Sequence, residues 1–193
     1  MPLSSVVGAQ SIVKPGVCTS STRPASPFEG QMIYETDTDK VLVWNGTDWY
    51  ANFNLPWGMV ARATSSTDYT LTTSAVIATG MTVTFTAVAN RYYKITYMEP
   101  QCQTSTVANS DTNTQIRVTN AAGTLLNQGF MRTVSAVQNT GTLTLVSTST
   151  FSAGSTTIVG CAKTTSTTGA PVLGRGAAAA GPALLLVEDI GPA

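Results

Sequence analysis

The acidic residues whose spacing suits shared chemistry are Glu35, Asp37 and Asp39. Clustered carboxylate oxygens are the ligands that a hard cation such as Ca²⁺ prefers. The same residues flank a tight turn predicted at 37–40, however, and no glycine or distal glutamate completes a calcium loop of a known type. Short Asp and Thr side chains form hydrogen bonds to the backbone of such turns. The pattern therefore favours turn formation, and we expect no metal site here.

Aromatic side chains gather in the same part of the chain, at Tyr34, Trp44, Trp49 and Trp57. Aromatic ring faces pack against sugars in glycan-binding proteins, so sugar binding is one interpretation. The other interpretation is that, in so small a segment, these rings form the core or the contact between copies of the chain. We expect the second role and take these residues as candidate assembly residues.

The sequence offers little for acid–base catalysis. Histidine, the commonest general base and metal ligand, does not occur in the chain. Glu188 and Asp189 are adjacent acids, but neighbouring side chains of a strand point to opposite faces, so these two cannot form a close carboxylate pair. We expect no enzymatic activity and no cofactor.

The cysteines, Cys18, Cys102 and Cys161, are far apart, and their number, 3, is odd. No CxxC pair is present, so their spacing does not match a zinc site. We expect free, buried thiols in a protein that is made in a reducing cytoplasm.

Charged residues make up only 10% of the 193 residues, against about 25% in a typical domain, and the net charge is zero. Lys and Arg do not cluster, so we expect no nucleic-acid partner. No apolar run reaches the length of a membrane-spanning helix, and we expect neither membrane insertion nor a secretory signal. A surface made neutral by hydroxyl groups suits a protein that buries much of itself against partners.

The elements that position these residues are predicted to be strands. Residues 23–50 are expected to form a miniature β-meander, with strands at 31–36, at 40–45 and around Trp49. The Asn45-Gly46 pair is a strong hairpin signal, because both residues accept positive φ. A sheet of this size is marginal alone and needs a partner surface.

After a predicted linker at 51–57, residues 58–193 alternate apolar and polar side chains over short segments separated by turn signals. This pattern is typical of a β-sandwich or barrel. Thr and Ser fill the polar positions where Lys and Glu usually protect strands from sideways pairing, which favours a closed symmetric oligomer. We interpret the alanine run at 177–180 as a loop. The predicted strands lie at 82–88, 91–98, 114–120, 142–151, 155–163 and 183–190, and the long connections at 103–113 and 164–178.

Residues 23–49 read RPASPFEGQMIYETDTDKVLVWNGTDW. This segment resembles a motif that recurs in bacteriophage virion proteins described as minor tail, tail-fibre or head-fibre proteins. The ending LLLVEDIGP at 184–192 is similar to that of many actinobacterial-phage minor tail proteins. The region 58–190 resembles the β-sandwich tip of such proteins, whose shape is similar to the trimeric C1q and tumour-necrosis-factor fold. The residues that match the first motif are Arg23, Pro24, Pro27, Glu29 to Thr38, Val41 to Gly46 and Trp49.

The resemblance implies an all-β homotrimer with a jelly-roll sandwich at 58–193 and a small stem at 23–50. It implies a structural protein of the virion, assembled in the bacterial host cytoplasm, with its N-terminal side towards the particle. The sandwich would face outward for adhesion to a glycan or protein of the host cell surface. Residues 1–22 are expected to be an extended arm, with one short strand near 11–13, that docks on other virion proteins. The candidate docking residues are Val6, Val7, Ile12 and Val13.

Two alternatives stay open at this point. The motif does not separate tail from head, so the chain is also interpreted as a head fibre or a decoration protein of the capsid surface. The lower alternative is a secreted lectin-like module, which predicts a signal peptide, paired cysteines and a definable sugar site.

Overall fold

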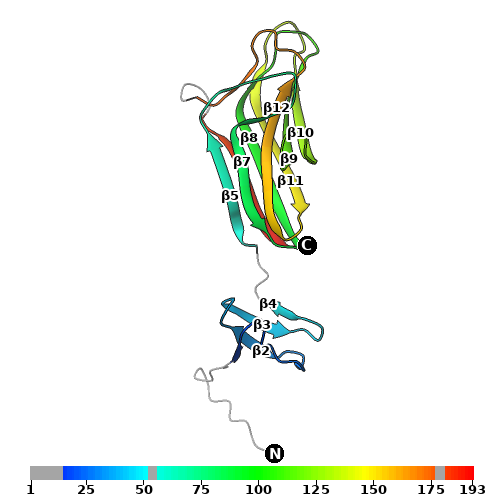
Figure 1. The fold of residues 1–193 in the computed structure, drawn as a ribbon. Coiled ribbons are helices and arrows are strands. Elements are labelled where there is room, and N and C mark those ends of the chain that lie inside the picture. The colour runs from blue at the N-terminus through cyan, green and yellow to red at the C-terminus, as the bar shows by residue number, and fades with distance from the viewer. Residues whose placement is uncertain (1–14, 52–55, 177–180) are drawn as a thin grey trace, which may run out of the picture. The chain divides into compact units, whose positions relative to one another are not determined.

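The computed structural model describes residues 15–51, 56–176 and 181–193 (Figure 1). The chain divides into two compact units, Met1–Asn54 and Leu55–Ala193. Every regular element within the described ranges is a strand, which confirms the all-β prediction, and none of the described residues forms a helix long and apolar enough to cross a membrane. The expected strand at 11–13 and the alanine loop at 177–180 lie outside the described residues.

The first unit is a sheet in the order β1-β2-β3-β4, in which β1 is parallel to β2 and the other pairs are antiparallel. The last three strands form the predicted meander. Asp39 and Gly46 have positive φ in its turns. Asn45, which was expected to share the positive φ of Gly46, does not have it, and its side chain instead accepts hydrogen bonds from two backbone N–H groups of the turn. The strands are β1 (Gly16–Cys18), β2 (Met32–Glu35), β3 (Lys40–Trp44) and β4 (Trp49–Ala51).

The second unit is a β-sandwich. One sheet has the order β10-β9-β12-β7, and the other has the order β5-β14-β8-β13-β6 with β11 paired to β8. The strands are β5 (Gly58–Ser65), β6 (Tyr69–Thr70), β7 (Val76–Ala87), β8 (Arg91–Gln103), β9 (Asp111–Val118), β10 (Leu125–Arg132), β11 (Thr140–Thr150), β12 (Gly154–Thr164), β13 (Val172–Gly174) and β14 (Ala183–Pro192).

The long strands of the sandwich pair in a nested way. The first pairs with the last (β5 with β14), the second with the last but one (β7 with β12), and so on inward through β8 with β11 to the β9–β10 hairpin, always antiparallel. This nesting is the wrapping of a jelly roll, in which a long hairpin folds over into two facing sheets. Figure 1 shows the two sheets face to face, with the connections at 104–110, 133–139 and 165–171 gathered at one end.

The core lies between the sheets and follows the alternation of the sequence. Tyr93, Ile95 and Tyr97 of β8 are almost fully buried, as are Val83 and Phe85 of β7. Leu185 and Val187 of β14, the neighbour of β8 in the same sheet, belong to the same core. The Phe85 and Tyr93 rings lie 5.1 Å apart between centroids, with Phe151 beside both. Such tilted and edge-on aromatic contacts add to the stabilisation from area burial.

The cysteines are free, and Cys102 and Cys161 are buried as expected. Burial raises the pKa of the Cys102 thiol to about 12 and that of Cys161 to about 11, so both are protonated and unreactive near neutral pH. Cys18, at the end of β1, is only partly buried, unlike the expected buried thiol.

Gly160 of β12 is required by the core. A Cβ atom at this position would lie 2.7 Å from Tyr97 Cζ and 3.0 Å from Met81 Cβ. We expect Gly160→Ala to destabilise the sandwich by about 1–3 kcal/mol, because the crowded atoms belong to packed core residues. The shift of the urea midpoint at unchanged slope measures this loss.

Gly141→Ala is the matched control. Its added Cβ would lie 2.8 Å from Met131 Cε, the far end of a flexible side chain that can move aside. Equal losses of stability in the two variants would contradict the assignment of Gly160 to a crowded core position.

Candidate functional site

The candidate assembly residues do not gather in one place. Trp44 and Trp49 pack edge-on, with ring centroids 5.6 Å apart and planes at 62°, and Tyr34 donates a hydrogen bond of 2.7 Å to Asp39 Oδ1. The buried apolar side chains of this sheet are Ile33 and Leu42, so its small core is aliphatic and the tryptophans stay partly exposed. Trp57 belongs to the sandwich, where its ring lies 4.1 Å from the Arg91 guanidinium.

Glu35, Asp37 and Asp39, the acids that were considered for a metal site, each have their own partner, which for Asp39 is the Tyr34 hydroxyl. Glu35 is buried and accepts hydrogen bonds from Arg23 Nε and from Thr38 Oγ1, and the bond from Arg23 holds the pKa of Glu35 below its ordinary value. Asp37 accepts from the backbone N–H of Ser20 at 2.9 Å. These contacts join the loop before β2 to the β2–β3 turn. No group of three potential ligands suited to a metal ion occurs in the parts of the chain that the structure describes.

The candidate docking residues Val6, Val7, Ile12 and Val13 lie outside the described residues.

A surface of a different kind covers the outer side of the β5-β14-β8-β11 sheet, and we call it the assembly face. Its residues are brought side by side by strand register, in rows that run across the sheet. One row is Thr64, Leu184, Met98 and Thr144, the next is Arg62, Leu186, Thr96 and Val146, and the third is Met59, Glu188, Lys94 and Thr148.

Apolar side chains dominate the centre of the assembly face. In β14 the run Leu184 to Val187 is apolar on both faces, with Leu185 and Val187 in the core and Leu184 and Leu186 on the outside. Strands that are apolar on both faces are typical of sheets covered on both sides. Met59 is 62% exposed and Val146 49%, so the second covering layer is missing from the single chain.

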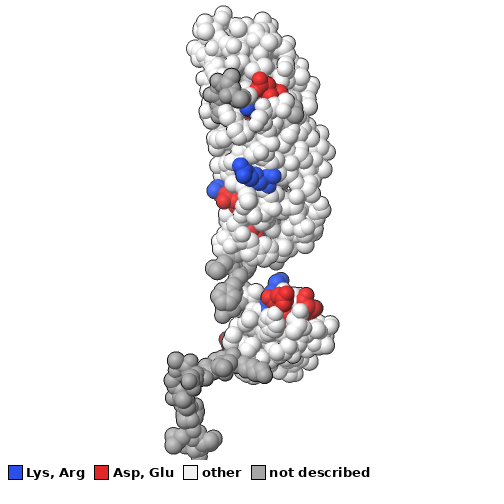
Figure 2. Space-filling view, turned by 90° about the vertical axis from the view of Figure 1, so that its left-hand side faces the viewer, with Lys and Arg blue, Asp and Glu red and all other residues white. Residues whose placement is uncertain are grey.

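Charge is sparse on the assembly face. Lys94 Nζ and Glu188 Oε2 form an ion pair of 3.0 Å, and Arg62 is the other charged residue in the rows. Figure 2 shows a largely uncharged sandwich surface with a few isolated charged groups. The outer side of the opposite sheet is polar instead, with Thr84, Thr86 and Lys163 among its outward residues. The two outer faces of the sandwich therefore differ in chemistry.

Two buried ion pairs support the sandwich from inside. Asp189, on the inner side of β14, pairs with Arg91 and accepts hydrogen bonds from the backbone N–H groups of Trp57 and Gly191. Burial alone would raise the pKa of Asp189, but the bonds that Arg91 and the two N–H groups donate outweigh it and hold this pKa below its ordinary value.

The second buried pair joins Glu99 of β8 to Arg175, which follows β13, and both side chains are fully buried. Arg175 Nε donates to Glu99 Oε2 at 2.8 Å, and Tyr97 donates its hydroxyl to the same carboxylate. Asp68 accepts from the backbone N–H groups of Arg175 and Gly176, so this network fastens the long connection between β12 and β14 to the sheet. That connection, predicted as a loop over 164–178, contains the short strand β13.

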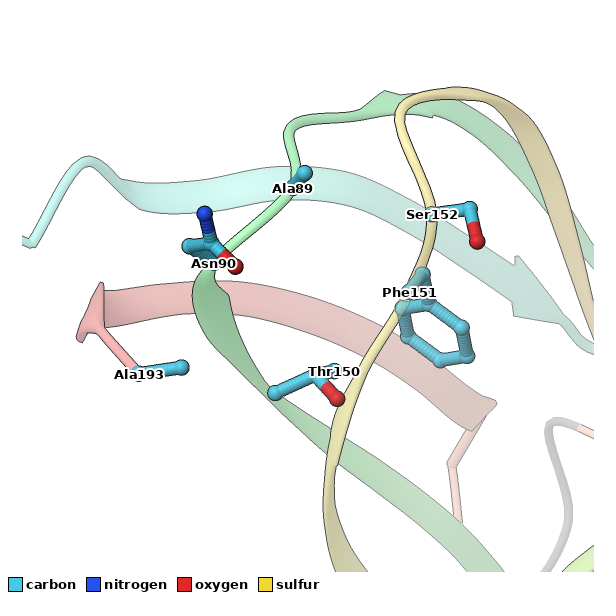
Figure 3. A pocket seen from close by; sticks show the side chains of 6 residues that line it. All are labelled: Ala89, Asn90, Thr150, Phe151, Ser152 and Ala193. Atoms are coloured by element: carbon cyan, nitrogen blue, oxygen red, sulfur yellow. The ribbon is translucent and has the colours of Figure 1, made fainter.

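A shallow pocket of about 390 Å³ lies at the end of the sandwich where β7 turns into β8 (Figure 3). The residues that line it are Ala89, Asn90, Thr150, Phe151, Ser152 and Ala193, and none of them is charged. The turn that forms it depends on Asn90, whose φ of 59° is positive. The lining offers the hydroxyl groups of Thr150 and Ser152 and the amide of Asn90.

Comparisons with known proteins give little. No protein-family model and no curated protein matches the sequence. Among solved structures, the crystal structure of infectious bursal disease virus VP2 subviral particle is similar at a TM-score of 0.26 and 13% identity, over 88% of this chain and 50% of that chain. A TM-score this low carries no inference about function, and this chain spans half the length of that protein.

Proposed function

We propose that this chain is a structural protein of a bacteriophage particle, a homotrimeric minor tail or fibre protein that displays its β-sandwich for adhesion to the host surface. The observation that carries the proposal is the assembly face, a sheet surface whose apolar centre lacks a second covering layer. Burial of Leu184, Leu186 and Met98 against other copies would supply that layer. The low charge of the face suits close packing of identical surfaces, because no row of like charges opposes it.

The sequence motif at 23–49 supports the virion part of the proposal, since it resembles a segment of phage minor tail and fibre proteins. The free cysteines agree with assembly in a reducing cytoplasm, whereas the secreted lectin-like alternative predicts paired ones. Multivalent display accounts for adhesion, because several weak sites on one assembly bind far more tightly together than each does alone.

Light scattering of the full chain tests the oligomer. We expect a molar mass of three times the 20.1 kDa chain for the wild type. Leu186→Glu places a charge at the centre of the assembly face, where desolvation would disfavour association, so we expect a mass near one chain. Val146→Glu, on strand β11 at the other side of β8, should weaken the oligomer as well.

Thr86→Glu is the control, because it adds the same charge to the outer side of the opposite sheet, next to Ser155. It should leave the oligomer intact. A stable wild-type monomer, or an oligomer that both Glu variants of the assembly face leave unchanged, would overturn the trimer.

Labelling of phage particles with antibodies against the sandwich, viewed by electron microscopy, separates tail from head. Tail labelling with loss of host adsorption would support the first proposal. Head labelling with loss of capsid stability would support the decoration protein instead.

A further inference from the structure

Phe130 is an apolar ring that the fold leaves in water. It lies on β10, the edge strand of its sheet, where Gly129 and Met131 face inward and Gln128, Phe130 and Arg132 face outward. The Phe130 side chain is 60% exposed, the highest value for an aromatic residue among the described residues of the sandwich. Core packing therefore does not explain a phenylalanine at this position.

An ion pair lies beside the ring. The Arg132 guanidinium lies 5.8 Å from the centre of the Phe130 ring and forms a two-pronged ion pair with Asp111, at 2.8 and 3.0 Å. Asp111 is in turn fixed to Thr165, whose Oγ1 accepts from the Asp111 backbone N–H at 2.7 Å. Arg132 uses Nε and Nη2 for this pair, which leaves Nη1 directed to no described acceptor.

The polar side chains around the ring belong to neighbouring strands of the same outer face. Strand register places Asn113 of β9 opposite Phe130, and Lys163 of β12 opposite Asn113. Gln128, two residues before Phe130, presents an amide on the same side. The result is one aromatic ring set among planar amide, carboxylate and guanidinium groups.

The end of the sandwich next to Phe130 is formed by three connections that carry no charged side chain and are joined by hydrogen bonds. The connections 104–110, 133–139 and 165–171 contain no Asp, Glu, Lys or Arg. Hydrogen bonds join them, from the Asn109 N–H to the Thr133 carbonyl at 2.7 Å and from the Thr106 N–H to the Thr168 carbonyl at 3.1 Å. A partner at this end would meet hydroxyl and amide groups together with the exposed side chains of Val107, Val134 and Val137, and no charged side chain of these connections.

We propose that Phe130, Arg132 and Asp111 form a binding site for a neutral saccharide, whose ring packs on the Phe130 face while its hydroxyl groups bind Arg132 and Asp111. The electron-rich face of an aromatic ring attracts the polarised C–H groups of a sugar, and ionised groups make stronger hydrogen bonds than neutral ones. A single ring in a polar field is too small for the apolar centre of a protein interface. A nucleic acid would need a positive groove, whereas Asp111 neutralises Arg132 here.

The saccharide site names a ligand for the proposed adhesion function. It rests on that function, since adhesion would bring this face into contact with cell-surface sugars. The probe is an array of neutral and acidic oligosaccharides, and the sample is the labelled full chain. We expect the wild type to bind at least one neutral oligosaccharide, Phe130→Ala to lower its signal at least tenfold, and Phe130→Tyr to retain it. Phe28→Ala is the matched control, because Phe28 is 70% exposed but lies in the other unit.

Unchanged melting temperatures would show that the variants are folded, as expected for an exposed side chain. Absence of wild-type binding to every neutral sugar, or binding that Phe130→Ala leaves unchanged, would overturn the site. Failure of the proposed function is distinguishable: a monomer in light scattering that still shows Phe130-dependent sugar binding would refute the trimer and keep the site.

Discussion

Glu99→Ala is expected to destabilise the sandwich by about 3–5 kcal/mol, because it leaves the fully buried Arg175 guanidinium without its carboxylate. Tyr97 would lose its acceptor at the same time. Arg175 anchors the connection that follows β13, so the loss should also increase proteolysis near that connection. Urea denaturation at fixed protein concentration measures the change, since association would otherwise alter the apparent stability.

The double variant Glu99→Leu with Arg175→Met tests whether the cost comes from the unpaired charge. Replacement of both partners by apolar side chains removes the buried charge, so the double variant should be clearly more stable than Glu99→Ala. A double variant that is less stable than the single one would show that geometry, rather than the orphaned charge, sets the cost.

Asp189→Ala is expected to cause a loss of similar size, about 3–5 kcal/mol, since Arg91 is also buried. The backbone N–H groups of Trp57 and Gly191 would lose their acceptor as well. Glu188→Gln is the matched control on the adjacent position, and because Glu188 lies on the assembly face, the variants are compared at a protein concentration low enough for the chain to be a single copy. Its partner Lys94 is 42% exposed, and an exposed pair contributes only about 0–1 kcal/mol. Equal losses at the two positions would contradict the assignment of Asp189 to the interior.

Asp189 also gives the sandwich a dependence on pH. Its folded pKa lies below the ordinary value of 3.8, so the stability it contributes is fully present above that value. This stability is lost as the pH falls through the folded pKa, because the carboxylate then takes up a proton and releases Arg91. Asp189→Ala should therefore flatten the loss of stability of the sandwich in strong acid, as thermal melts over a pH series would show.

The sequence predicted the strands whose alternation is regular and missed those whose alternation is broken. β7, β8 and β12 are found where they were expected, though each is longer. β10 was not predicted, because Gly129 interrupts its pattern and Phe130 faces water. A Cβ at position 129 would lie 2.8 Å from Leu145 Cδ2 across the core, a contact that sequence alone does not reveal.

The assembly face and the buried ion pairs depend on contacts between distant parts of the chain. The uninterrupted run of Leu184 to Val187 was a readable signal for a strand covered on both sides, but the neighbours of that strand follow from register alone. Glu99 and Arg175 are 76 positions apart, so no local pattern joins them. Trp57 was grouped with the aromatic residues of the first unit by proximity in sequence, whereas its contacts are with Arg91 and Asp189.

The nested pairing of the strands has a consequence for folding. β14 lies between β5 and β8 in the middle of its sheet, yet it follows both of them along the chain. Until β14 has been synthesised and inserted, the facing edges of β5 and β8 stay open and offer unpaired backbone groups to other chains. The pairing of β14 with β5 also joins the first and last strands of the sandwich sequence, and such pairing between distant segments makes folding slow. We therefore expect newly made chains to be prone to aggregation until β14 has left the ribosome and inserted between β5 and β8.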